Sequence, residues 1–235
     1  MALNKQVFKT RALTALIFVA VMLVGLFWNF WSFLVLFTII HFGAWYEFVK
    51  LMKKIYGNKY LLYCLFGVFY ITMPILMMID LRKTFSEFEG YKYLQDTGLS
   101  LPLCIIFSIW INDTMAYIVG SFIGKTPFSK ISPKKTWEGT IGGIILCVVV
   151  IGFLYPIVMK YFLHPSIPDI AWFIIPAICG IFGTLGDLLE SKLKRMADVK
   201  DSGSFMPGHG GFLDRFDSLL IATPFVWLYV NLFIL

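Results

Sequence analysis

The sequence predicts an all-α integral membrane protein, a single bundle of about seven transmembrane helices. Hydrophobic residues make up 59% of the chain and charged residues only 14%, against about 45–50% and about 25% in soluble domains. The mean hydropathy is +0.80. The apolar residues also gather into runs of about 20, the length that crosses a bilayer as a helix. With 235 residues, the chain has no room for a separate soluble domain beside such a bundle.

Seven apolar runs have the length of a membrane span. They cover approximately residues 12–28, 30–49, 61–81, 99–120, 139–162, 168–189 and 216–235. No small-residue cleavage site follows the first run, so we expect a permanent helix there rather than a signal peptide. We divide the bundle into N-terminal transmembrane helices at 1–98 and a transmembrane region with cytoplasmic loops at 99–235, which contains all the candidate catalytic residues described below.

The basic residues predict the orientation of these spans. If the N-terminus is cytoplasmic, only Arg82, Lys83, Lys92 and Lys160 fall on the outer side, and the other sixteen of the twenty Lys and Arg residues face the cytoplasm. This asymmetry agrees with the positive-inside rule. It places the loop "GKTPFSKISPKKTWEG" and the polar stretch 191–217 on the same cytoplasmic face.

Acidic residues in or beside the spans are the first candidates for a functional site. An Asp at the centre of a membrane helix costs roughly 2.5–3.5 kcal/mol on insertion scales. Asp113 interrupts an apolar run and shares one helical face with Ala116, Tyr117 and Gly120. This pattern predicts a small, polar face turned into the bundle. The structural alternative is a buried Asp that is capped by a neighbouring donor.

A second acidic position lies in "CGIFGTLGDLLESKLKR", where Gly180, Gly183 and Asp187 share one helical face. The two glycines predict close helix packing. Asp187 is either a functional carboxylate or the partner of a lysine.

The third acidic position is "GHGGFLDRFDS", where Asp214 and Asp217 share a face if the last helix starts there. The Pro-Gly-His-Gly-Gly run before them exposes backbone N–H groups, which suits an anion-binding loop. The alternative is a flexible turn with a capping Asp.

These carboxylates predict a divalent metal site beside a basic surface. Mg²⁺ is held by one or two carboxylates together with substrate phosphates. Lys134 and Lys135 stand directly before a predicted helix start, where the helix dipole would favour a phosphate. Carboxylates, a metal and basic groups at the lipid headgroup level indicate phosphoryl or nucleotidyl transfer on a lipid.

The stretch 191–217, called here the signature segment, resembles the signature of the phosphatidate cytidylyltransferases, or CDP-diacylglycerol synthases. The matching positions are Ser191, Lys194, Arg195, Lys200, Asp201, His209, Gly210, Gly211, Asp214, Arg215 and Asp217. The likeness continues upstream through "NDTMAYIVGSFIGKTPFSKISPKKTWEGTIGG" and "GTLGDLLES", and covers roughly residues 108–235. Such a long motif with so many polar positions is specific.

The resemblance implies the conversion of CTP and phosphatidate to CDP-diacylglycerol and diphosphate at a bacterial inner membrane. It implies Mg²⁺ as the cofactor, and leaves open whether a monovalent cation joins it. It further implies a homodimer in the lipid bilayer, with no nucleic-acid partner.

The resemblance also implies roles for individual residues. The implied metal ligands are Asp187, Asp214, Asp217 and Asp113. The implied catalytic residues are Asp187, Asp214, Lys194 and Arg195. The implied substrate-binding residues are Lys134, Lys135, Lys200, His209, Gly210, Gly211 and Arg215. For His209, donation to a phosphate and organisation of the glycine loop stay open.

Two other functions fit parts of the sequence. A CTP-dependent lipid kinase of the polyprenol type would use similar groups but would release CDP instead of diphosphate. An ion-coupled transporter would place its Asp residues along a path across the bilayer, within repeated halves. The His-Gly-Gly and Asp-Arg-x-Asp residues favour the cytidylyltransferase over the kinase. The transporter ranks lowest, because the chain has no visible internal repeat and its polar groups gather on one face.

Overall fold

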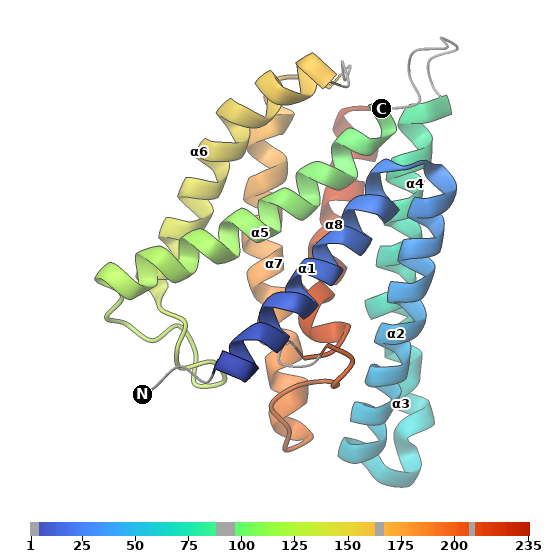
Figure 1. Cartoon of the computed structure of the whole chain (residues 1–235), viewed down its shortest axis with the longest axis vertical. Helices are drawn as coiled ribbons and strands as arrows, with labels where there is room; N and C mark the ends of the chain where they lie inside the picture. Colours follow the sequence, from blue (N-terminus) through green and yellow to red (C-terminus); the bar gives the residue numbers. More distant parts are fainter. Residues whose placement is uncertain (1–4, 88–96, 163–166, 207–209) are drawn as a thin grey trace. The chain divides into compact units, whose positions relative to one another are not determined.

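Every regular element is helical in the computed structural model, which describes residues 5–87, 97–162, 167–206 and 210–235 (Figure 1). The predicted all-α fold is therefore confirmed. The elements are α1 (Lys5–Phe27), α2 (Phe30–Tyr56), the short 3₁₀ helix η1 (Gly57–Lys59), α3 (Tyr60–Gly67), the π-helical turn η2 (Val68–Thr72), α4 (Met73–Glu87), α5 (Thr97–Ile123), α6 (Trp137–Phe162), α7 (Ala171–Met196) and α8 (Leu213–Phe233).

The chain forms two compact units. Unit 1 comprises Met1–Thr72 and Lys192–Phe216, and unit 2 comprises Met73–Ser191 and Asp217–Leu235. One boundary between them falls between η2 and α4, and the other two fall inside helices α7 and α8. As a result, most of the signature segment belongs to unit 1, whereas Ser191 and Asp217 at its two ends belong to unit 2.

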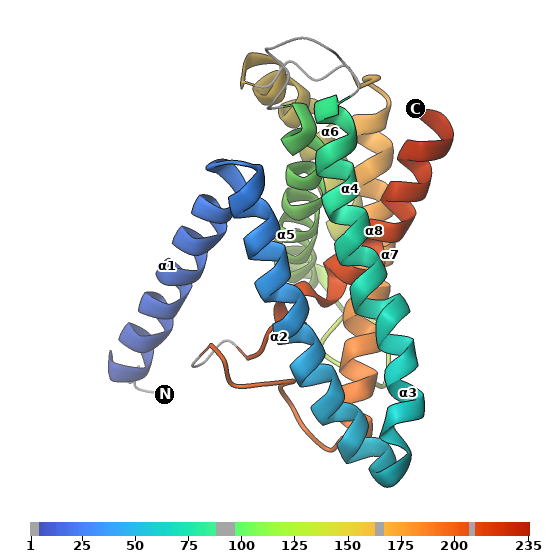
Figure 2. The ribbon, with the colours of Figure 1, turned by 90° about the vertical axis from the view of Figure 1, so that its right-hand side faces the viewer.

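In unit 1, helix α2 begins and ends at identifiable signals. Asn29 caps its N-terminus, because its side chain accepts a hydrogen bond from the Ser32 amide at 2.8 Å while Ser32 Oγ accepts from the Asn29 amide at 3.0 Å. Gly57 ends the helix at a φ of +54°, a conformation that favours glycine. The chain then reverses through η1, and α3 runs back along α2 (Figure 2).

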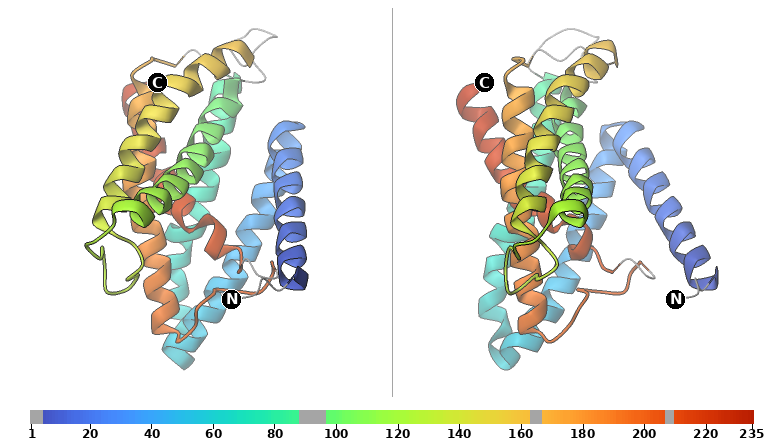
Figure 3. Two further views of the ribbon diagram at one scale, coloured as in Figure 1. Left: turned by 60° about the vertical axis from the view of Figure 1, so that its left-hand side comes forward. Right: turned by 90° about the vertical axis from the view of Figure 1, so that its left-hand side faces the viewer.

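In unit 2, small residues bring helices into close contact. A Cβ atom at Gly143 would lie 2.7 Å from the Ala116 Cβ, which shows how tightly α6 packs on α5 (Figure 3). Helix α7 approaches two further helices in the same way. A Cβ at Gly180 would lie 2.9 Å from Ile144 of α6, and a Cβ at Gly183 would lie 3.4 Å from Ser218 of α8. The predicted packing role of Gly180 and Gly183 agrees with this arrangement.

Five helical stretches of the described residues are long and apolar enough to cross a membrane. They are Phe30–Lys83, Gly98–Ile123, Trp137–Met159, Ala171–Met196 and Leu213–Phe233. The predicted number of seven is not confirmed. Two predicted spans fall within the single run Phe30–Lys83, because a short 3₁₀ helix replaces a loop between α2 and α3. A third falls in Ala12–Phe27, a shorter apolar stretch within α1. The protein is an integral membrane helical bundle by these criteria.

The end of α7 differs from the expectation. The sixth apolar run was predicted to end near residue 189, yet the helix continues to Met196. Lys194 and Arg195 therefore lie in its last turn rather than in a loop. Basic side chains are favourable at this end of a helix because they face the negative pole of its dipole.

Candidate active site

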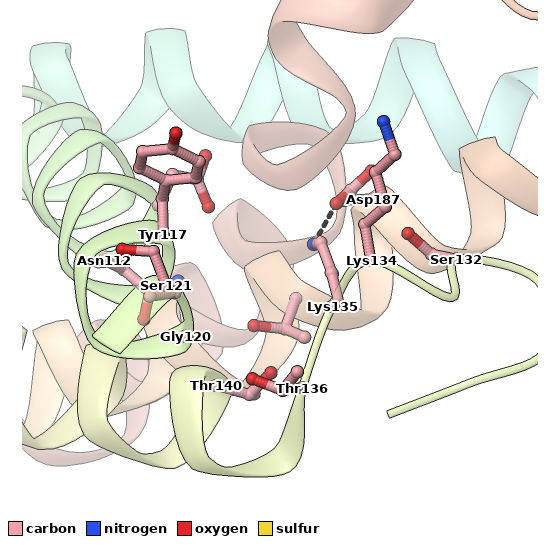
Figure 4. Close-up of a pocket in the computed structure, with 13 residues that line it drawn as sticks. Asn112, Tyr117, Gly120, Ser121, Ser132, Lys134, Lys135, Thr136, Thr140 and Asp187 are labelled. Atoms are coloured by element: carbon pink, nitrogen blue, oxygen red, sulfur yellow. Dashed lines mark ion pairs between the residues drawn. The ribbon is translucent and has the colours of Figure 1, made fainter. Parts of the chain in front are cut away.

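A polar pocket of about 460 Å³ opens in unit 2 (Figure 4). Residues from four parts of the chain line it: α5, the segment before α6, α6 itself and α7. Asp113, Ala116, Tyr117 and Gly120 all contribute, so the four residues of this α5 face do lie together. Asp113 and Tyr117 are exposed in the open pocket, however, and are not turned into the interior of the bundle as predicted. The other lining residues are Asn112, Ser121, Ser132, Lys134, Lys135, Thr136, Thr140, Thr184 and Asp187.

The segment between α5 and α6 holds the two predicted lysines at this pocket. Thr136 caps α6, since its Oγ1 accepts a hydrogen bond from the Gly139 amide at 3.1 Å. Glu138 in the first turn of α6 accepts hydrogen bonds from the Lys125 and Thr126 amides at 3.2 Å, which fastens the other end of the segment. The predicted helix start directly after Lys135 is therefore confirmed.

Lys135 forms an ion pair with Asp187 of α7, drawn as a dashed line in Figure 4. Both side chains keep about 30% of their surface exposed, 29% for Lys135 and 28% for Asp187. The sequence left open whether Asp187 is a functional carboxylate or pairs with a lysine. It does pair with one, and it stays accessible from the pocket.

Asp187 also belongs to a group of three carboxylates in unit 2. Ligand oxygens of Asp187, Glu190 and Asp217 all lie within 4.8 Å of one another. Glu190 is fully buried and Asp217 is 8% exposed. Gly186 permits this arrangement, because a Cβ there would lie 3.0 Å from the Ser218 Cα of α8.

This carboxylate group suits a hard divalent cation. Three converging carboxylates, two of them buried, offer the oxygen ligands that Mg²⁺ and Ca²⁺ prefer. The residues present thus fit the metal that the resemblance implies. Glu190 was not among the predicted ligands, although its position one helical turn after Asp187 is visible in the sequence.

The predicted ligand Asp214 has a different setting, in unit 1. Its Oδ1 accepts a hydrogen bond from the Lys194 ammonium at 2.7 Å, and the two side chains are 9% and 13% exposed. Its Oδ2 accepts hydrogen bonds from the Gly211 amide at 2.7 Å and the Ser202 amide at 2.9 Å. Asp214 therefore organises the signature segment in this structure, and its role as a metal ligand stays a prediction.

Gly210 has a local structural role beside Asp214. It adopts a φ of +82°, which L side chains rarely adopt, and a Cβ there would lie 2.5 Å from the Asp214 Oδ2. The backbone conformation and the lack of space both call for glycine at this position.

The remaining predicted residues are more exposed. Arg195, Lys200 and Arg215 all have exposed side chains, as substrate-binding cations would. Arg195 donates a hydrogen bond to the Val199 carbonyl at 3.5 Å. His209 lies outside the described residues.

Sequence reasoning missed a buried carboxylate, Glu47 of α2. It is 3% exposed and accepts hydrogen bonds from the signature segment. A weaker signal was available, since Glu47 is the only acidic residue of the stretch "HFGAWYEFVK", but it stands near the end of the predicted span 30–49, where the insertion cost is lower than at the centre.

Unit 1 also contains an apolar groove of about 410 Å³ between α1, α2 and the signature segment. Among the residues that line it, Thr14 has the one hydroxyl side chain. The apolar part comes from Ile17, Phe18, Val21, Met22, Leu36, Ile39, Ile40, Phe205, Met206, Phe212 and Phe216. Such a lining suits a hydrocarbon chain rather than a polar ligand.

Comparison with known proteins agrees with this chemistry. The model of the cytidylyltransferase family matches residues 61–233. A phosphatidate cytidylyltransferase of Bacillus subtilis is 41% identical over 159 residues, which are 67% of this chain and 57% of that protein. One of Staphylococcus saprophyticus is 45% identical over 139 residues, 57% of this chain and 52% of that protein. One of Synechocystis is 42% identical over 161 residues, 68% of this chain and 53% of that protein.

The matched part therefore spans slightly more than half the length of these curated relatives. The family match, at residues 61–233, includes the pocket of unit 2, the three carboxylates and the whole signature segment. Since the family model extends over well more than half of the sequence, the chain belongs to the cytidylyltransferase family.

Proposed function

We propose that this protein is a phosphatidate cytidylyltransferase that makes CDP-diacylglycerol and diphosphate from CTP and phosphatidate. The observation that carries the proposal is the joint presence, in unit 2, of three converging carboxylates and a polar pocket with two lysines. The names of the relatives support the choice of substrates.

The carboxylates Asp187, Glu190 and Asp217 would hold the Mg²⁺ ion. When bound, the metal neutralises the negative charge that develops on the phosphates and helps to align them. Asp113 lies on the pocket wall with Asp187 but outside the group of three carboxylates. Its implied role as a metal ligand stays a prediction, and from this wall it would also orient bound water or a ligand group.

The side chains of the protein itself bind and align the two anionic substrates. Lys134 and Lys135 would contact phosphate oxygens from the pocket wall. The N-terminus of α6 would add the positive end of its helix dipole. An oxygen of the phosphatidate phosphate forms a bond to the α-phosphorus of CTP, while the bond from that phosphorus to the bridging oxygen of the β-phosphate breaks. Diphosphate leaves with the electron pair. Because the attacking phosphate is already ionised at neutral pH, no side chain has to remove a proton.

The deciding experiment is turnover by the purified protein in detergent with CTP labelled in the cytidine, phosphatidate and Mg²⁺, with and without EDTA. Labelled lipid and free diphosphate, both lost on chelation, are the expected products. CDP together with a phosphorylated lipid alcohol, in a parallel reaction with a polyprenol, would instead identify a lipid kinase. Absence of any nucleotide turnover by folded protein would reject both enzymes and favour a transporter.

Replacing Lys134 by Ala should raise the KM for CTP or phosphatidate about tenfold and leave kcat nearly unchanged. The reason is that Lys134 is exposed on the pocket wall, where it would bind a phosphate equally in the ground state and the transition state. Steady-state kinetics with each substrate varied in turn measure this. Lys130→Ala removes a lysine of the same segment that does not line the pocket, and it should leave both constants unchanged. A fall in kcat with unchanged KM would contradict a pure binding role for Lys134.

We also propose that the N-terminus and the segment 124–136 face the cytoplasm of a bacterial cell, and that the protein works as a homodimer. The distribution of basic residues supports the orientation, and the resemblance supports the dimer. A cysteine introduced at Lys130 should react with a membrane-impermeant maleimide in inverted inner-membrane vesicles but not in intact spheroplasts. Labelling in spheroplasts alone would show the opposite orientation.

The proposed homodimer is tested by the mass of the purified protein, measured by light scattering with a correction for bound detergent.

A further inference from the structure

Glu47 joins helix α2 to the start of helix α8 within unit 1. Its Oε1 accepts a hydrogen bond from the Phe212 amide at 2.9 Å, and its Oε2 accepts from the Leu213 amide at 2.9 Å. Ser202 Oγ lies 2.7 Å from the same Oε2. The carboxylate is buried, so these bonds are made away from solvent.

These contacts make Glu47 the N-terminal cap of α8, supplied by a distant helix. The first N–H groups of a helix have no partner within the helix. A nearby side chain usually accepts from them, but here a residue 165 positions earlier does so. A carboxylate at this end is also favoured by the positive pole of the helix dipole.

Ser202 connects this cap to Asp214. Its hydroxyl lies within hydrogen-bond distance of both carboxylates, 2.7 Å from Glu47 and 2.9 Å from Asp214. Because a hydroxyl has one proton to donate, Ser202 shares it between the two acids. The Ser202 amide donates to Asp214 as well, at 2.9 Å. Glu47 is therefore linked, through one residue, to the pair that Asp214 forms with Lys194.

Two glycines leave room for the Glu47 carboxylate. A Cβ atom at Gly203 or at Gly211 would collide with it. Neither glycine is among the residues that adopt a positive φ in the described part of the chain, so the backbone itself would accept alanine at both positions. The second glycine of the His-Gly-Gly motif is therefore explained by the presence of Glu47.

We propose that Glu47 is a positioning residue for the cytidylyl transfer, which holds the signature segment and the first turn of α8 in their working geometry. This inference rests on the proposed function. It assigns to α2, outside the signature segment, the side chain that determines where Asp214 and its neighbours lie.

The first test compares Glu47→Gln with wild type. Glutamine keeps the volume but turns an N–H₂ group toward N–H donors, so it cannot accept all three hydrogen bonds. We expect kcat to fall at least about tenfold while KM for CTP and phosphatidate changes less than about threefold. Amide hydrogen exchange should accelerate at least about tenfold at one of Phe212 and Leu213, the one whose acceptor oxygen is replaced by the N–H₂ group. Asp80→Asn, the same change at an acid of α4, should alter neither readout.

Unchanged kcat or unchanged exchange in Glu47→Gln would overturn the proposal. If that variant does not fold, Glu47→Asp is compared with wild type instead. It retains the charge but draws the carboxylate away from the two amides, so the same fall in kcat and faster amide exchange are expected. The exchange measurement does not depend on turnover. An inactive wild type would therefore refute the proposed function, while the exchange at Phe212 and Leu213 would still decide whether Glu47 caps α8.

A double variant tests whether Gly211 is needed because of Glu47. Gly211→Ala alone should lower kcat strongly, since the new methyl group meets the carboxylate. Glu47→Asp withdraws the carboxylate by about 1.5 Å, one carbon–carbon bond. Combining the two should therefore give a kcat above the product of the two separate effects. Strictly multiplicative losses would show that Gly211 and Glu47 act independently, and would overturn this part of the inference.

Discussion

Asp187→Asn is expected to abolish turnover, with kcat at least about a thousandfold below wild type and the fold retained in detergent. The substitution removes the charge of the accessible member of the carboxylate group and breaks its ion pair with Lys135. A metal held by carboxylates loses both affinity and position when one of them becomes an amide. Initial rates over a range of Mg²⁺ concentrations, together with thermal unfolding of the same preparation, measure the effect.

Asp80→Asn is the matched control for this change. Asp80 of α4 accepts a hydrogen bond from the Trp227 indole at 2.7 Å and lies outside the proposed machinery. Its amide variant retains an acceptor oxygen, so normal kinetics are expected. Near-normal turnover by Asp187→Asn would refute Asp187 as a metal ligand and leave Glu190 and Asp217 without their accessible partner.

Asp214→Asn should lower kcat at least about a hundredfold, because it weakens several contacts at once. The carboxylate accepts from the Lys194 ammonium and from the Ser202 and Gly211 amides. An asparagine retains one acceptor oxygen and turns N–H₂ toward one of these donors, which leaves a buried donor unsatisfied. Steady-state kinetics and the Mg²⁺ concentration for half-maximal rate are the measurements.

The metal dependence of Asp214→Asn separates its two candidate roles. If Asp214 ligates Mg²⁺, as the resemblance implies, the variant should need a much higher Mg²⁺ concentration. If Asp214 only organises the signature segment with Lys194, kcat should fall while the metal requirement stays that of wild type. A variant with near-normal kcat would contradict both roles.

The sequence by itself determined the class of the protein and the approximate positions of its helices. Hydropathy and run length are local properties, so each predicted span coincides with helical residues, from the first at α1 to the last at α8. Asp113 and Asp187 were found by the same logic, because a charge in an apolar run is conspicuous whatever it contacts. Helix ends were less predictable. The last two turns of α7 are polar, and helical hydrogen bonding continued past the end of the apolar run to Met196.

Only the tertiary structure decided which of these polar residues meet. The pair of Lys135 with Asp187 and the group of Asp187 with Glu190 and Asp217 join segments that lie far apart in the sequence. Glu47 is the clearest case. Nothing near it in the sequence indicates that its partners are amides 165 and 166 positions later. A buried carboxylate must find donors wherever the packing brings them, and packing between distant helices is the property that local sequence patterns do not contain.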